Sequence, residues 1–206
     1  MDWRGCLRDS RFYVLWLAFM CGAGAGVTVI NNVASLADTL GVACNSSALV
    51  TALGIANAFG RLFAGWASDR TVMAGLPRAT ALAAVLTLAS AVHLSLAAGV
   101  APLLYPLVAI AGVCYGAMFS LTLAICGDLF GPTHIGANNG LLDLGPAAGS
   151  FVFATWAASY FYGRGGDDDG GGDDDDCRGV GCFRGTFLVT GTATAAAAVM
   201  VLAALV

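Results

Sequence analysis

The sequence contains no lysine and no glutamate, so every basic side chain is arginine and every acidic one is aspartate. Charged residues make up only 11% of the 206 residues, whereas hydrophobic residues make up 58%. Soluble domains usually carry about 25% charged residues, so this chain has too little polar surface to fold in water. The shortage of charge therefore excludes an ordinary soluble domain and indicates a membrane protein.

Long apolar stretches fill almost the whole chain. A helix needs about 20 apolar residues to cross the hydrocarbon core of a bilayer, so each stretch predicts one transmembrane helix. We expect an all-α membrane protein with six transmembrane helices, forming a single domain over residues 1–206 without a separate soluble part. The predicted spans are about 12–38, 45–66, 79–98, 102–126, 135–161 and 185–206.

The net charge of −4 comes from an Asp/Gly-rich loop at 163–184, with seven aspartates between Asp167 and Asp176. A calcium site needs ligands fixed around a turn, so the repetitive sequence favours a low-complexity insertion. A disulfide between Cys177 and Cys182 is compatible with a non-cytoplasmic loop, and zinc would need two further ligands that are not nearby. We expect no metal site and no cofactor.

Arginine distribution predicts the orientation, because cytoplasmic loops of membrane proteins carry an excess of arginine and lysine. The arginines near the N-terminus and in the loop between the second and third stretches outnumber those of the Asp/Gly-rich loop. We therefore expect both termini to be cytoplasmic and the 163–184 loop to be non-cytoplasmic.

Polar side chains are concentrated in the first, second, fourth and fifth stretches. Because polar groups are costly against lipid, we expect the third and sixth helices to face lipid, with His93 at the membrane interface. The other four helices should face a cavity or a partner, although hydrogen bonding between helices is the alternative for the asparagines. The candidate cavity residues are Asn31, Asn32, Asn57, Tyr115, Ser120 and Asp143.

Asp143 lies about eight residues into the fifth stretch, which places it about 12 Å deep at 1.5 Å per residue. A buried carboxylate at that depth should be paired, protonated or functional. Two interpretations stay open: a proton-coupling or cation-binding acid, and a structural hydrogen bond between helices.

A short polar motif, Gly65-x-x-x-Asp69-Arg70, lies between the second and third stretches. Together with Arg61 and Asp128, it predicts a cytoplasmic charge cluster that gates the protein, the alternative being side chains that extend to the lipid headgroups.

The fifth stretch contains a second short motif, Gly145-Pro146-x-x-Gly149. A proline inside a membrane helix kinks it and frees a carbonyl. We expect a kink at this point.

Both motifs resemble elements of the major facilitator superfamily. The first resembles its signature loop, in which the glycine permits a tight turn, and the acid and base hold neighbouring helix ends together in one transport state. The basic continuation usual in the family is replaced here by residues 71–78. The second motif is similar to the core of the family's antiporter motif.

The chain as a whole resembles one branch, the nodulin-like, nuclear-fusion-defective-type transporters of plants, algae and protists. The resemblance covers nearly all 206 residues and is carried by residues 22–32, 56–65 with Ser68-Asp69, 135–140, and Cys177-x-Gly179-x-x-Cys182-Phe183. In that family these elements lie in the C-terminal six-helix half. The resemblance therefore implies one half of a major-facilitator-type fold, either truncated or paired with a second copy or a separate half.

The function implied by this resemblance is transport of a small solute by alternating access, with the solute bound between two six-helix halves. The expected partners are the lipid bilayer, a small solute that the sequence does not identify and whose coupling to protons stays open with the role of Asp143, and the missing half or a second copy, with no nucleic acid. The alternative is a non-transporting membrane protein that assembles with or regulates a partner. No nucleophile–base pair, phosphate loop or metal-ligand spacing in the sequence supports an enzyme.

Overall fold

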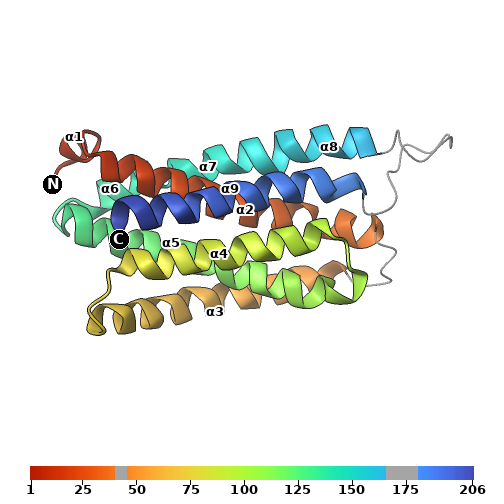
Figure 1. Cartoon of the computed structure of the whole chain (residues 1–206), viewed down its shortest axis with the longest axis horizontal. Helices are drawn as coiled ribbons and strands as arrows, with labels where there is room; N and C mark the ends of the chain where they lie inside the picture. Colours follow the sequence, from red (N-terminus) through yellow and green to blue (C-terminus); the bar gives the residue numbers. More distant parts are fainter. Residues whose placement is uncertain (40–45, 166–180) are drawn as a thin grey trace.

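The computed structural model describes residues 1–39, 46–165 and 181–206, which form a bundle of long helices (Figure 1). Six helical spans are long and apolar enough to cross a membrane: Ser10–Thr39, Ser47–Met73, Arg78–Ala97, Ala101–Phe130, Ile135–Tyr162 and Gly181–Leu205. The predicted fold class, an all-α membrane protein with six transmembrane helices, is confirmed. The two ends of the chain lie at the same end of the bundle (Figure 1).

The fifth span is divided into four elements, whereas each of the other spans contains one long helix. In chain order the elements are α1 (Trp3–Cys6), α2 (Ser10–Thr39), α3 (Ser46–Met73), α4 (Arg78–Ala97), the 3-10 turn η1 (Ala101–Leu103), α5 (Leu104–Phe130), α6 (Ile135–Leu142), α7 (Leu144–Gly149), the π-helix η2 (Ser150–Ala157), α8 (Ala158–Gly165) and α9 (Gly181–Leu205).

The second span extends beyond its predicted end at residue 66, because α3 continues to Met73. The polar residues after Trp66 contain no helix breaker until Gly75, which has φ +80°, and Pro77, which caps α4. The left-handed conformation at Gly75 ends the helix in the way that glycine commonly does. The sequence motif Gly65–Arg70 therefore lies in the last turns of a helix and not in a loop.

Helix α3 packs closely on α5 because glycines remove the side chains at their contact. A Cβ added to Gly112 would lie 2.7 Å from the Leu53 carbonyl oxygen, and one added to Gly116 would collide with the Asn57 carbonyl oxygen. Gly60 faces the backbone of Val113 in the same way. The small-residue pair Gly112 and Gly116 thus serves helix packing.

Helix α2 meets the fifth span in a similar backbone contact. A Cβ on Gly24 would lie 2.7 Å from the Gly149 Cα, and a Cβ on Gly149 would collide with the Met20 carbonyl oxygen. Gly145 lies over the backbone of Trp16, where an added Cβ would be 3.1 Å from its carbonyl oxygen. Gly24, Gly145 and Gly149 therefore determine how closely these two helices cross.

Helices α4 and α9 lie side by side along the bundle (Figure 1) and share a buried face. His93 belongs to that face, with 1% of its surface exposed, so it does not face lipid as the sequence predicts. Its Nδ1 lies 2.7 Å from the Ala89 carbonyl oxygen and its Nε2 lies 3.1 Å from the Ala25 carbonyl oxygen on α2. This polar contact between α4 and α2 could not be predicted from the apolar composition of α4.

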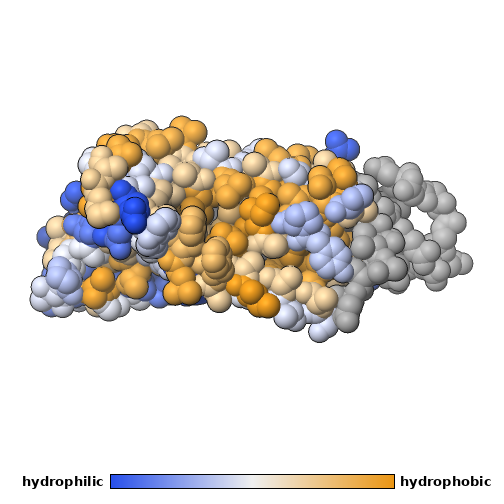
Figure 2. All heavy atoms as spheres, turned by 90° about the horizontal axis from the view of Figure 1, so that it is seen from below, coloured by the Kyte–Doolittle hydropathy of each residue, from blue (hydrophilic) through white to orange (hydrophobic). Residues whose placement is uncertain are grey.

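Large apolar side chains remain exposed on α3 and on the fifth span. On α3 they include Phe59 and Leu62, exposed by 58% and 77%, and on the fifth span Leu144 is exposed by 59%. Seen from below Figure 1, apolar atoms form a band across the middle of the molecule, with the strongest hydrophilic patch toward the end that carries the termini (Figure 2). This distribution fits a bundle whose middle is covered by lipid or by another apolar protein.

Candidate functional site

A cavity of about 300 Å³ opens between the second, fourth and fifth spans. The longest of these elements, α3 and α5, contribute Arg61 and Ser120. The break between α6 and α7 contributes Asp143. Three of the polar residues expected near a cavity or gate therefore line one cavity, whose full lining is Arg61, Phe119, Ser120, Leu123, Asn139, Asp143 and Pro146.

Arg61 is held at the cavity by contacts on three sides. Its guanidinium carbon lies 4.6 Å from the centroid of the Phe119 ring, within cation–π range. Its Nε donates to Asn57 Oδ1 over 3.4 Å, and the Ser120 hydroxyl donates to the Arg61 carbonyl oxygen over 2.9 Å. Arg61 forms no ion pair with an acidic side chain in the described part of the chain.

Asp143 lies in the break between α6 and α7, and its side chain is exposed to the cavity. The sequence predicts a buried carboxylate, and the six-helix bundle does not bury it. Its Oδ2 accepts a hydrogen bond of 3.0 Å from Asn139 Nδ2 on α6, one turn earlier. The carboxylate is therefore positioned by its own helix, not by a neighbouring one.

Arg61 and Asp143 lie at a similar depth in the bundle. Arg61 precedes Asp69 by eight residues, and Asp143 follows the first residue of α6 by eight residues. Helix α3 continues to Met73, twelve residues after Arg61. At 1.5 Å per residue, Arg61 is about 18 Å and Asp143 about 12 Å from a helix end that lies on the side of the termini. For comparison, the middle of a hydrocarbon core about 30 Å thick lies about 15 Å from either face.

The other candidate cavity residues lie outside this lining. Asn31 is exposed on α2, and Asn32 donates to the Thr28 carbonyl oxygen of its own helix over 2.9 Å. Tyr115 is half-buried, with its ring edge on Phe119 at 5.1 Å between centroids and its side chain over Gly26. Asn57 and Tyr115 therefore support the cavity residues Arg61 and Phe119, whereas the two α2 asparagines do not.

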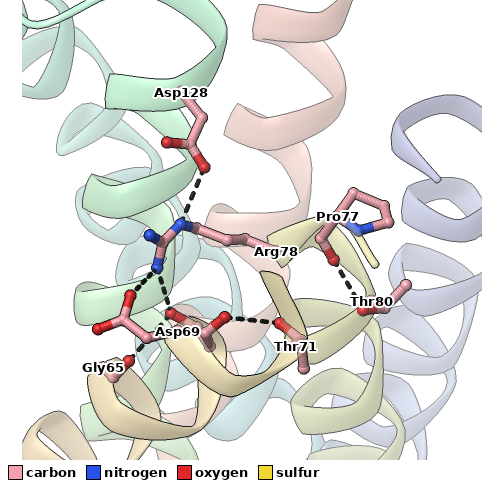
Figure 3. Close-up of polar contacts among 8 residues, drawn as sticks. Gly65, Asp69, Thr71, Pro77, Arg78, Thr80 and Asp128 are labelled. Atoms are coloured by element: carbon pink, nitrogen blue, oxygen red, sulfur yellow. Dashed lines mark hydrogen bonds and ion pairs between the residues drawn. The ribbon is translucent and has the colours of Figure 1, made fainter. Parts of the chain in front are cut away.

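A cluster of three charges (Figure 3) lies at the start of α4, at the end of the bundle that carries the termini (Figure 1). Arg78, the first residue of α4, donates from Nη1 to Asp69 Oδ1 over 2.6 Å and to the Ser68 hydroxyl over 2.7 Å. Its Nε forms an ion pair with Asp128 Oδ2 on α5 at 2.9 Å, outside hydrogen-bond geometry. We call Asp69, Arg78 and Asp128 the three-charge cluster, and it ties the ends of α3, α4 and α5 together.

The composition of this cluster differs from the prediction. Asp69 and Asp128 both form an ion pair with Arg78, which takes the place predicted for Arg61 and Arg70. The Arg70 guanidinium lies 5.0 Å from the centroid of the Trp66 ring, and Arg61 points into the cavity. Helical geometry explains the change, because adjacent residues such as Asp69 and Arg70 point about 100° apart on the continuous helix α3.

Gly65 does not provide a tight turn in this protein, contrary to the resemblance. It lies inside α3, and a Cβ added to it would meet no atom within 4 Å. The turn glycine is Gly75, ten residues further along.

The Gly145-Pro146-x-x-Gly149 motif lies immediately after the break in the fifth span. Proline has no N–H and therefore cannot bond the carbonyl of Leu142, four residues earlier. The chain resumes as α7 and then as the π-helix η2, an element that is frequent at functional sites. Asp143 thus lies at the point where the regular helix is interrupted.

Cys182 is buried at the start of α9 and is disulfide-bonded. Cys177 lies outside the described residues, as do the aspartates between Asp167 and Asp176, so the predicted pairing stays a prediction. Within residues 1–39, 46–165 and 181–206, no group of three His, Cys or Asp side chains is placed to hold a metal ion.

Sequence reasoning missed three functional candidates: Arg78, Asn139 and Phe119. Arg78 carried a signal, since it is a single arginine at the start of a helix joined by a short loop to the helix of Asp69. Asn139 lies four residues before Asp143, the spacing of helical neighbours. Phe119 carried no signal, because one aromatic residue in an apolar helix cannot be distinguished from a packing residue.

Two comparisons with known proteins bear on this site. Residues 3–205 match the family described as NFD4, C-terminal domain. The protein NUCLEAR FUSION DEFECTIVE 4 of Arabidopsis thaliana is 29% identical over 152 residues, which cover 73% of this chain and 26% of that protein. The chain therefore corresponds to about a quarter of the length of this relative.

Proposed function

Because the chain belongs to the NFD4 C-terminal-domain family, we propose that it is one six-helix half of a major-facilitator-type secondary transporter. The observation that carries the proposal is the cavity lined by Arg61, which forms no ion pair among the described residues, and by the exposed carboxylate of Asp143, about 12–18 Å from the ends of their helices. Ionisable side chains at this depth usually mark a substrate or ion pathway.

Large apolar side chains are exposed next to the cavity residues Arg61 and Asp143 in the sequence, which supports the presence of a second half. They include Leu62 on α3 and Leu144 on α7. In facilitators the solute is bound between two halves that move alternately, so a cavity bordered by apolar helices is the expected form of one half. We propose that the second half is a further six-helix bundle, on the same polypeptide, on a separate one, or in a second copy of this chain.

The three-charge cluster supports a gate at the end of the bundle that we propose to be cytoplasmic. Arg78 is next to the C-terminal ends of α3 and α5, where free carbonyls and the carboxylates of Asp69 and Asp128 all carry negative charge. One guanidinium therefore offsets repulsion between two helix ends. Movement of α4 away from them would break both ion pairs. The two ion pairs therefore stabilise the present arrangement relative to one in which α4 has moved away.

The test is uptake into vesicles by a complete transporter that contains these residues, screened against small solutes. Saturable uptake that Asp143→Asn abolishes or makes independent of pH would support Asp143 as a cation-binding or proton-coupling acid. Unchanged uptake at every pH would exclude both roles. Absence of uptake of any solute, together with a stable complex with another protein, would favour the alternative of a non-transporting membrane protein. We propose no catalytic role and no cofactor.

A further inference from the structure

The cavity contains two charges of opposite sign that do not neutralise each other. Arg61 comes from α3 and Asp143 from the break between α6 and α7. Among the described residues, three ion pairs are formed, and neither Arg61 nor Asp143 takes part in any of them. The cavity therefore presents a cationic and an anionic group to whatever occupies it.

Both groups retain unused hydrogen-bonding capacity. A guanidinium has five N–H donors, and Arg61 uses only its Nε, on Asn57 Oδ1. The carboxylate of Asp143 accepts one hydrogen bond at Oδ2, from Asn139. The terminal N–H groups of Arg61 and Oδ1 of Asp143 make no hydrogen bond within the described part of the chain.

The contacts that are made hold the two groups in position without neutralising them. Phe119 lies under the guanidinium at 4.6 Å, which restricts its rotation and leaves its outer edge available. Asn139 holds the carboxylate from one turn below. Such positioning by neutral neighbours is what a binding site for a charged ligand requires.

Unpaired charges at this depth are costly unless a ligand or partner supplies the opposite charges. A carboxylate suits the guanidinium of Arg61, because it accepts two parallel N–H bonds, and an ammonium suits the carboxylate of Asp143. We propose that this cavity binds a zwitterionic solute with one carboxylate and one ammonium group, in the manner of a free amino acid. The inference rests on the proposed transport function and names the class of its solute.

A solute with a single charge would fit this cavity less well. An amine would pair with Asp143 and leave Arg61 unsatisfied, and a simple carboxylate would do the reverse. An unpaired buried charge opposes binding of the wrong ligand. The cavity of about 300 Å³ is also at the small end of ligand sites, which favours a small zwitterion over a large one.

The experiment measures binding directly on the 206-residue chain in lipid nanodiscs, by ligand-observed saturation-transfer NMR with three probes of similar size. L-alanine carries both charges, ethylamine only the ammonium and propionate only the carboxylate. We expect L-alanine to bind at least about tenfold more tightly than either probe, a difference of about 1.4 kcal/mol. Arg61→Gln should reduce the affinity for L-alanine to that for ethylamine, and Asp143→Asn should reduce it to that for propionate.

Two control variants remove the same charges elsewhere. Arg4→Gln removes an arginine that also lies over an aromatic ring, 5.1 Å from the Trp3 centroid, and Asp38→Asn removes an exposed aspartate of α2. Both should preserve the preference for L-alanine. Arg61→Lys keeps the charge and should retain part of the preference, which maintains the test if Arg61→Gln fails to fold.

The inference is overturned if ethylamine or propionate binds as tightly as L-alanine, or if L-alanine shows no saturable binding at millimolar concentration. The latter result would mean that another polypeptide supplies the opposite charges. Failure of the transport proposal would give a different result: L-alanine would bind to the chain, but the complete transporter would show no uptake. Uptake of a solute that is not zwitterionic would support transport and overturn the inference alone.

Discussion

Arg78 Nη1 lies 2.6 Å from Asp69 Oδ1, which joins the first residue of α4 to the last turns of α3 across the turn at Gly75. Both Asp69 and Asp128 are largely exposed, whereas the Arg78 side chain is only 21% exposed. The arginine is thus the shared, less accessible member of the three-charge cluster. Loss of Arg78 should therefore affect both aspartates, whereas loss of one aspartate should leave the other ion pair intact.

A double-mutant cycle should detect this pairing. We expect Asp69→Asn and Arg78→Gln to be coupled by about 0.2–1 kcal/mol in the free energy of unfolding, the range of partly exposed ion pairs. The matched cycle of Asp69→Asn with Arg70→Gln should be additive, because Arg70 lies on Trp66 and not on Asp69. Thermal unfolding in detergent measures both cycles. Equal coupling in the two cycles would contradict the assignment of Arg78.

Gly149→Ala should destabilise the protein because the new methyl group would collide with the Met20 carbonyl oxygen on α2. Overpacking of this kind costs about 1–3 kcal/mol, which thermal unfolding in detergent would show as a lower midpoint. Gly65→Ala is the control, since an added Cβ at that position meets no atom within 4 Å. If the two variants unfolded at the same temperature, the close crossing of α2 and the fifth span would be refuted.

Pro146→Ala should restore a backbone N–H that can bond the Leu142 carbonyl and so make the break at Asp143 more regular. We expect slower amide hydrogen exchange across residues 142–147 and reduced uptake by the complete transporter. Pro77→Ala is the control, because Pro77 caps α4 at the three-charge end, outside the cavity. Unchanged exchange in Pro146→Ala would show that the break does not depend on the proline.

His93→Ala should be destabilising, because it removes a buried ring that lies 3.1 Å from the Ala25 carbonyl oxygen and leaves a cavity between α2 and α4. Truncation of a large buried side chain to alanine costs about 2–5 kcal/mol. Ser95→Ala on the same helix loses only a bond to its own helix, to the Ala91 carbonyl oxygen, and should unfold near the wild-type temperature. A wild-type unfolding temperature for His93→Ala would return His93 to a peripheral position.

The sequence was sufficient to predict the number of helices and the fold class, because apolar length is a direct requirement of the bilayer. Of the predicted cavity residues, Ser120 and Asp143 line the cavity together with Arg61, which the sequence assigns to the charge cluster; their functional roles stay predictions. The predicted end of the second span at residue 66 is wrong, because polar residues do not by themselves end a helix, and α3 continues through them to Met73. Only Gly75 and Pro77 actually terminate it.

The contacts between helices could not be predicted, because they depend on how helices rotate about their axes. Arg78 and Arg70 are both arginines near Asp69 in the sequence, and only the packing of α4 beside α3 decides which of them reaches its carboxylate. His93 was misplaced for the same reason. Its buried environment is created by α2, which is nearly 70 residues away in the sequence.

The π-helix η2 has a consequence for the exposed aromatic side chains of the fifth span. In an α-helix, residues five apart point about 140° away from each other, whereas i to i+5 bonding brings them to one side. Phe151 and Trp156 are five apart, and both are exposed, by 68% and 63%. The wider turn of the π-helix therefore determines which side chains share this exposed surface. A single deletion within residues 150–157 would rotate every side chain between the deletion and Tyr162 relative to α7, with no change in their chemistry.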